Sequence, residues 1–285
     1  MTAQLRFFRT LFRGITPVAP GAAASLALAL FRRPPRHQDS PEEREAIARA
    51  EPLHLSLDGR PLAAWRWGHG PAVLLVHGWG SRGSRLGSFV APLTEAGYSV
   101  VAFDAPGHGA SAGRLSSLPQ FISAIERLGR ELGSLEAIVA HSMGGAATTL
   151  AMARGLPVRR VVFLAPAADP AGYSERFAEA LGLTPDVLRR MKQSIERRFG
   201  FRWEDFDVLR AARKMTAPLL VFHDRADRDV AWTDGEAIAA AWPGAELVST
   251  EGLGHRRIVH DPEVVSRTIA FLAGTKRATR ASRRA

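Results

Sequence analysis

Short apolar runs recur through the middle of the chain and predict a sheet of mainly parallel strands. They lie at residues 72–76, 99–103, 137–140, 161–164, 219–222 and 246–249. Most are followed by a segment with helical periodicity, the alternation expected when helices cover both faces of a parallel sheet. Upstream, residues 53–57 and 62–67 alternate between apolar and polar around Asp58-Gly59-Arg60, which predicts a hairpin leading into the sheet. The predicted fold class is therefore α/β.

One interval is too long for a plain crossover between two strands. Between the runs that end at residue 164 and begin at residue 219, helical patterns cover 174–181, 185–199 and 203–215. A crossover connection needs far fewer residues. We expect about residues 167–215 to form a small helical cap, inserted above the sheet, that walls the active site.

The two ends of the chain differ from this central domain, which we place at residues 51–275. Six arginines fall in residues 1–36 and five basic residues in 276–285, without an acidic residue in either segment, so the ends carry the whole net charge of +10. The domain itself is nearly neutral, which argues against a nucleic-acid-binding face. We expect residues 1–50 to form a basic and apolar helical arm with a linker, and residues 276–285 to be a disordered basic tail.

The arm has the outline of an export signal, because arginines precede an apolar stretch at residues 15–31. Pro17 and Pro20 interrupt that stretch, no small-residue cleavage site follows it, and it is too short and broken for a transmembrane helix. Apolar side chains also fall at helical spacing among the arginines, at Leu5, Phe8, Leu11 and Phe12. We favour a helix packed on the domain's own surface in a cytoplasmic protein; peripheral contact with a membrane is the alternative.

A candidate nucleophile stands where a central strand turns into a helix. The hydrophobic run 137–140 leads into Ser142, and Gly144 follows two residues later. This pattern resembles the nucleophile elbow of the α/β hydrolases, usually written G-x-S-x-G, with Ala140 in place of the first glycine. Small residues are needed there because the serine sits on a tight, strained turn. We therefore expect Ser142 to be the nucleophile.

Two further segments resemble loops of the same family. A strand ends in His77-Gly-Trp-Gly80, which is similar to the family's oxyanion loop, and residues 104–111 match its segment D-x-x-G-H-G-x-S. The resemblance implies that the backbone N–H groups of Trp79 and Met143 would hold the oxyanion of a tetrahedral intermediate. It also implies that three conspicuous polar residues brace these loops instead of taking part in the chemistry: His77, Asp104 and His108.

A serine hydroxyl needs an imidazole to remove its proton and a carboxylate to fix the tautomer of that imidazole. In the family, the acid follows the strand after the cap and the histidine follows the last strand. Asp227 matches the position of the acid, with Asp229 as the runner-up and Asp224 too close to the strand. His255 matches the position of the base, whereas its rival His260 reads as the start of the closing helix.

These motifs occur in the family's order over residues 53–272, so the chain is identified as a member of the α/β-hydrolase serine hydrolases, in the branch of esterases, lipases and serine aminopeptidases. The resemblance implies hydrolysis of a carboxylic ester in a small-molecule acyl substrate through an acyl-enzyme, with no cofactor and no metal. The chain has no cysteine, which excludes disulfides and a cysteine nucleophile. Amide hydrolysis is the enzymatic alternative, and a non-catalytic binding or membrane-tethered protein on the same fold is the other.

Overall fold

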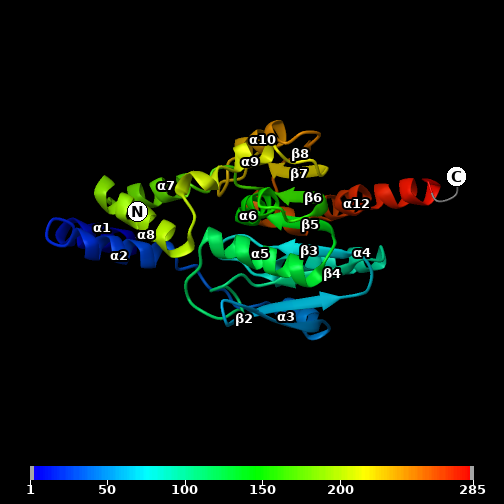
Figure 1. The fold of residues 1–285 in the computed structure, drawn as a ribbon, viewed down its shortest axis with the longest axis horizontal. Coiled ribbons are helices and arrows are strands. Elements are labelled where there is room, and N and C mark those ends of the chain that lie inside the picture. Colours follow the sequence, from blue (N-terminus) through cyan, green and yellow to red (C-terminus); the bar gives the residue numbers. More distant parts are fainter. Residues whose placement is uncertain (1–2, 283–285) are drawn as a thin grey trace.

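The computed structural model describes residues 3–282, with side chains up to Gly274, and is built on one eight-stranded sheet (Figure 1). The strands are β1 (Glu51–Leu57), β2 (Arg60–Trp67), β3 (Ala72–Val76), β4 (Ser99–Phe103), β5 (Leu135–His141), β6 (Val158–Leu164), β7 (Leu219–Asp224) and β8 (Glu246–Thr250). Their order in the sheet is β1-β2-β4-β3-β5-β6-β7-β8. β2 pairs antiparallel with β1 and β4, and all other neighbours are parallel. The predicted fold class and the hairpin are confirmed.

Helices cover both faces of the sheet, and alternate residues of β3 point to opposite sides. Leu74 and Val76 pack in one apolar cluster, and Val73 and Leu75 in the other. The first cluster is completed by α5 (Leu118–Leu132), α6 (Met143–Ala153), α9 (Val208–Ala212) and α10 (Trp232–Ala241). The second is completed by η1 (Gly83–Phe89), α4 (Val90–Glu95), η3 (Ile258–His260) and α12 (Pro262–Ser282). The short helix α11 (Gly254–Arg257) follows β8.

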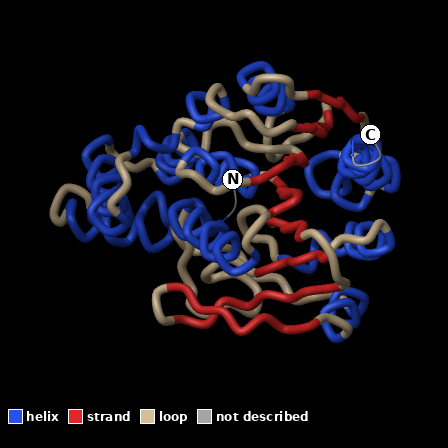
Figure 2. The backbone as a smooth tube through the Cα atoms, turned by 45° about the vertical axis from the view of Figure 1, so that its right-hand side comes forward, coloured by secondary structure: helices blue, strands red, loops and turns tan. Residues whose placement is uncertain are grey.

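The cap lies between β6 and β7, as predicted from the long interval there. It contains α7 (Gly172–Leu181), α8 (Pro185–Phe199) and η2 (Trp203–Phe206). Two helices of the N-terminal arm, α1 (Ala3–Ile15) and α2 (Pro20–Phe31), lie against α7 and α8. Figure 1 and Figure 2 show these four helices gathered on one side of the sheet. The arm and the cap therefore form one helical layer, although most of the sheet separates them in sequence.

The contact between the arm and the cap is apolar and tightly packed. Ala23, Ala24 and Ala27 of α2 are buried in a cluster with Leu181, Val187 and Met191 of the cap. Small side chains let two helix backbones approach closely. Burial of apolar surface between them stabilises the fold by about 25 cal/mol per Å². The arm thus packs on the protein's own surface, as expected.

Any contact with a membrane would involve the outer surface of the arm. Phe7 and Val18 lie there and are 63% and 86% exposed. Among the described residues, no helix is long and apolar enough to cross a bilayer. Peripheral contact through the arm stays a prediction.

The two segments that flank the domain are also partly placed. α3 (Pro41–Ala48) begins with a capping box between Ser40 and Glu43 and packs on η1. α12 continues as a helix to Ser282. Residues 276–282, which were expected to be disordered, thus continue this helix, and residues 283–285, for which disorder was also expected, lie outside the described residues.

We predict that Ala27→Arg destabilises the protein by about 3 kcal/mol or more, because it would bury an unpaired charge between α2 and α8. Ala29→Arg is the matched control, since Ala29 is exposed on the same helix and should change stability by less than about 0.5 kcal/mol. Urea unfolding of both variants measures the difference. Equal stability of the two variants would show that the arm is not packed on the cap.

Candidate active site

Ser142 occupies a strained turn between the end of β5 and the start of α6. Its φ of 55° is positive, which is uncommon for a residue with a side chain. The backbone N–H of Ser142 donates to the carbonyl of Leu164, 2.9 Å away, and so holds the turn against β6. A Cβ on Gly144 would lie 2.7 Å from the carbonyl oxygens of Val76 and His77. Glycine is therefore required for α6 to start this close to β3.

Asp227 and His255 lie together at the ends of β7 and β8. The His255 Nδ1 is 2.7 Å from the Asp227 Oδ2, and the side chain of Asp227 has no solvent exposure. The other carboxylate oxygen accepts the backbone N–H groups of Asp229 and Val230, at 2.8 and 2.9 Å. An ionised carboxylate only accepts, so Nδ1 of His255 carries the proton and Nε2 keeps its lone pair. Such an imidazole can take a proton from a hydroxyl.

The rival acids and the rival histidine have other surroundings. Asp229 faces Arg256 at 3.6 Å, and its side chain is half exposed. Asp224 accepts from the N–H of Leu253 at 2.8 Å and from the hydroxyl of Thr250 at 2.9 Å, so it ties β7 to the loop that carries His255. His260 is exposed in η3. The geometry thus pairs His255 with Asp227.

Ser142, His255 and Trp79 line a common cavity of about 540 Å³. The loop with Trp79 comes so close to the elbow that a Cβ on Gly78 would lie 2.8 Å from the Cβ of Ser142. Met143 is the first residue of α6, where backbone N–H groups have no partner within the helix. The loop that carries Trp79 and the first residue of α6 thus both lie next to the serine.

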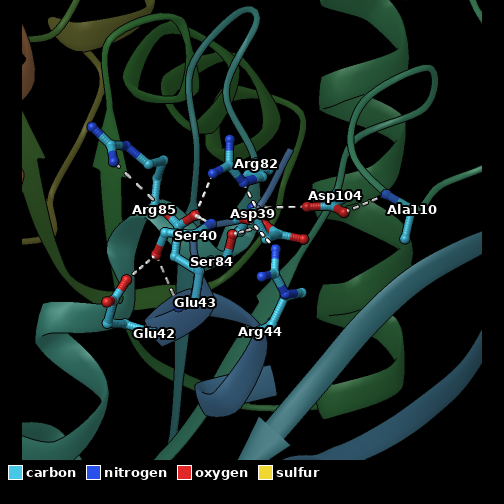
Figure 3. Close-up of polar contacts among 11 residues, drawn as sticks. Asp39, Ser40, Glu42, Glu43, Arg44, Arg82, Ser84, Arg85, Asp104 and Ala110 are labelled. Atoms are coloured by element: carbon cyan, nitrogen blue, oxygen red, sulfur yellow. Dashed lines mark hydrogen bonds and ion pairs between the residues drawn. The ribbon is translucent and has the colours of Figure 1, made fainter. Parts of the chain in front are cut away.

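Three polar residues brace this region, as expected from the sequence. His77 accepts the N–H of Ala105 through Nε2 at 2.9 Å and contacts the carbonyl of Gly78 through Nδ1. The Nε2 of His108 accepts the N–H of Gly80, at 3.1 Å. Asp104 accepts the N–H groups of Gly83 and Ala110, at 2.8 and 2.7 Å (Figure 3). All of these bonds hold the loops that approach Ser142.

The sequence also matches a known protein family. Residues 73–268 match the model of the Alpha/beta hydrolase family. The chain belongs to the alpha/beta hydrolase family. This confirms the predicted family and enzyme class.

This hydrolase is similar to proteins of known name. A pimeloyl-[acyl-carrier protein] methyl ester esterase from Xanthomonas campestris pv. campestris is 29% identical over 246 residues, which covers 72% of this chain and 96% of that protein. The dihydrolipoyllysine-residue acetyltransferase component of an acetoin cleaving system from Cupriavidus necator is 36% identical over 145 residues, or 48% of this chain, but only 38% of its own length is spanned. The solved monoacylglycerol lipase of Paleococcus ferrophilus has a TM-score of 0.60 at 23% identity and covers 75% of this chain and 98% of its own.

Two histidines of this hydrolase that contact Asp227 or His255 were not predicted from the sequence. His141, directly before the serine, places its Nε2 2.9 Å from the carbonyl oxygen of His255, and their rings are 4.6 Å apart. His223, at the end of β7, lies with its Nε2 3.5 Å from the Asp227 carboxylate and 3.1 Å from the carbonyl of Val230. Their positions before the elbow and before the acid were visible in the sequence, but neither belongs to the motifs that it matched.

The charges of the hydrolase site differ sharply between the carboxylate and the imidazoles. Burial alone would raise the pKa of Asp227, but the hydrogen bonds from His223, His255 and the backbone of Val230 outweigh it and lower that pKa. Burial lowers the pKa of His141 to about 3, and the nearby His255 adds to this shift. Burial likewise lowers the pKa of His108 to about 4. The described residues contain no group of His, Asp and Glu side chains arranged to hold a metal ion.

We predict that His141 makes the hydrolase less stable in acid. Its pKa of about 3 in the folded state lies below the usual value of about 6.5 that it regains on unfolding. Between these values the unfolded chain binds a proton that the folded chain does not. The free energy of unfolding therefore falls as pH falls below about 6.5, by up to about 1.4 kcal/mol per pH unit.

Urea unfolding of wild type and His141→Asn between about pH 4.5 and 7.5 checks this prediction. Asparagine keeps a donor for the carbonyl of His255 but does not titrate. As pH falls below about 6.5, the free energy of unfolding of wild type should fall relative to that of His141→Asn. A difference that is constant over this range would contradict the prediction.

Proposed function

We propose that the protein is a serine hydrolase that cleaves a carboxylic ester, with Ser142 as nucleophile, His255 as general base and Asp227 as the acid that orients it. One observation carries this proposal: the hydrogen-bonded pair of Asp227 and His255 shares a cavity with Ser142 on its strained turn. Because Nδ1 of His255 is committed to the carboxylate, its Nε2 is the nitrogen available to the serine hydroxyl.

In this mechanism, Ser142 Oγ attacks the acyl carbon while His255 Nε2 takes its proton. The carbonyl oxygen becomes an oxyanion, and the backbone N–H groups of Trp79 and Met143 donate to it. His255 then gives its proton to the leaving alcohol oxygen, and the C–O bond breaks. Water, deprotonated by His255, then attacks the acyl-enzyme. The carboxylic acid product leaves as His255 returns the proton to Ser142.

One feature supports an ester as the substrate. The relative that the chain matches over 96% of its length is named as a methyl ester esterase. Serine at the elbow provides a hydroxyl to form an acyl-enzyme, which ester and amide substrates have in common. Ester and amide substrates with the same acyl group separate the proposed reaction from its closest alternative, because an esterase cleaves only the former at an appreciable rate.

We predict that Ser142→Ala and His255→Ala each lower kcat for a p-nitrophenyl ester by about 10⁴-fold to 10⁶-fold. The double variant should lose little more, since the groups act as a unit. His260→Ala is the matched control and should retain nearly full activity. Losses that multiply in the double variant would argue against the assignment.

A fluorophosphonate probe gives a readout that does not depend on the substrate. It reacts with an activated serine, so it should label wild type and not Ser142→Ala. A wild-type protein that stays unlabelled while correctly folded would favour the non-catalytic alternative.

We predict that Asp227→Asn lowers kcat/KM by about 10⁴-fold, because an amide no longer fixes the reactive tautomer of His255. Asp229→Asn should cost less than about tenfold, since its half-exposed contact with Arg256 is weak. Both variants are compared by ester hydrolysis, with circular dichroism to confirm folding. A larger loss in Asp229→Asn would transfer the role of the acid to that residue.

A further inference from the structure

Two cavities of different chemistry meet at Ser142. The first, described above, is the polar cavity; His37, Arg85, His141 and Arg256 are among its lining residues. The second, also about 540 Å³, is the apolar cavity. Its lining residues include Leu30, Phe31, Phe177, Ile195, Trp203 and Phe206. Trp79, Ser142, Tyr173 and Asp229 line both cavities. A substrate whose carbonyl carbon sits at Ser142 can therefore extend into either one.

The position of His255 decides which part of an ester enters which cavity. His255 lines the polar cavity and is not among the residues that line the apolar one. The imidazole must give its proton to the leaving oxygen, so the leaving group has to lie on its side of the serine. The acyl chain is then directed into the apolar cavity. Met143, whose N–H faces the oxyanion in the proposed mechanism, lines that cavity.

The N-terminal arm supplies one wall of the apolar cavity. Leu30 and Phe31 are the last two residues of α2, and the facing side chains belong to α7, α8 and η2. The rings of Phe31 and Phe177 pack edge to face, with centroids 5.1 Å apart. The cavity is therefore closed on one side by a helix that precedes the catalytic domain in sequence.

The end of α2 is fixed to the domain by hydrogen bonds. Arg32 is 6% exposed, and its Nε and Nη2 donate to the carbonyl of Ser116 at 3.3 Å and to Gln120 at 3.1 Å. The Ser116 N–H donates back to the carbonyl of Arg32, at 2.7 Å. Buried hydrogen bonds to a charged group are costly to break. Leu30 and Phe31 thus directly precede a residue that is anchored to the catalytic domain.

The linker is fixed a second time beside the oxyanion loop. Figure 3 shows Asp39 and Glu43 directed at Arg82, whose side chain is 9% exposed and pairs with both carboxylates. Ser84 donates to the same oxygen of Asp39, at 2.7 Å. Removal of Arg82 would take away the cation that both carboxylates share, which is destabilising for the mostly buried Glu43. The linker between α2 and α3 is thus tied to the catalytic domain at both of its ends.

We propose that the apolar cavity binds the acyl chain and that the arm, through Leu30 and Phe31, sets the length of chain that the enzyme accepts. This inference rests on the proposed ester hydrolysis. The match to the family model begins at residue 73, so the arm lies outside it.

The test compares kcat/KM for p-nitrophenyl acetate, butyrate and octanoate. Leu30→Trp fills the cavity and should lower the octanoate-to-acetate ratio by about tenfold or more, as expected when a pocket loses room for methylene groups. Phe31→Ala enlarges the cavity and should shift the preference toward the longer chain. Ala29→Trp is the matched control, because Ala29 is exposed and does not line the cavity; its ratio should equal that of wild type.

A binding measurement separates this inference from the proposed reaction. In the Ser142→Ala background, calorimetric titration with octanoate and acetate reports binding without hydrolysis. Leu30→Trp should weaken octanoate binding by about tenfold and leave the melting temperature close to that of Ala29→Trp. If wild type hydrolyses no ester but Leu30→Trp still weakens octanoate binding, the proposed reaction fails and the acyl site stands. Unchanged chain-length ratios and unchanged octanoate binding in both Leu30→Trp and Phe31→Ala would overturn the inference.

Discussion

The close approach of three backbones around Ser142 is the constraint on which the rest of the structure depends. The serine takes a positive φ, α6 starts against β3, and the loop after β3 passes over the elbow. Gly144 and Gly78 permit these approaches, because a Cβ at either position would overlap its neighbours. The cost of the strained turn is offset by the packed parallel strands on both sides. His255, paired with Asp227, lines the same cavity as Ser142 from the ends of β7 and β8.

Two lowered pKa values set the charges next to His255. Burial lowers the pKa of His141, whose ring lies 4.6 Å from that of His255, so this imidazole is neutral near pH 7. Asp227 stays ionised because its pKa is lowered by the groups that donate to it. In the proposed mechanism, the imidazolium that forms when His255 accepts the serine proton is paired with this carboxylate. His223 contacts the carboxylate of Asp227, and His141 contacts the backbone carbonyl of His255, so both help to hold the pair in place.

Sequence reasoning found the elements that local patterns define and the residues that match family motifs. Strand patterns predicted the sheet, and the resemblance to the family's order of serine, acid and histidine implied the pairing of Asp227 with His255. It could not find His223, because its contact with Asp227 depends on how one loop folds back. It also could not join Asp39 and Glu43 to Arg82, or Phe31 to Phe177, because long stretches of chain separate these partners. Apolar periodicity in the arm indicated a buried face but not the surface that covers it.

The arm links stability to selectivity. The alanine face of α2 lets this helix approach α8 closely, and that approach sets how far Leu30 and Phe31 reach into the apolar cavity. Arg32 fixes only the end of α2, so the position of these side chains also depends on the packing of the preceding turns. A substitution that loosens the alanine face would move the wall of the cavity as well as weaken the fold. Changes far from Ser142 can therefore alter the accepted chain length without touching the residues that carry the reaction.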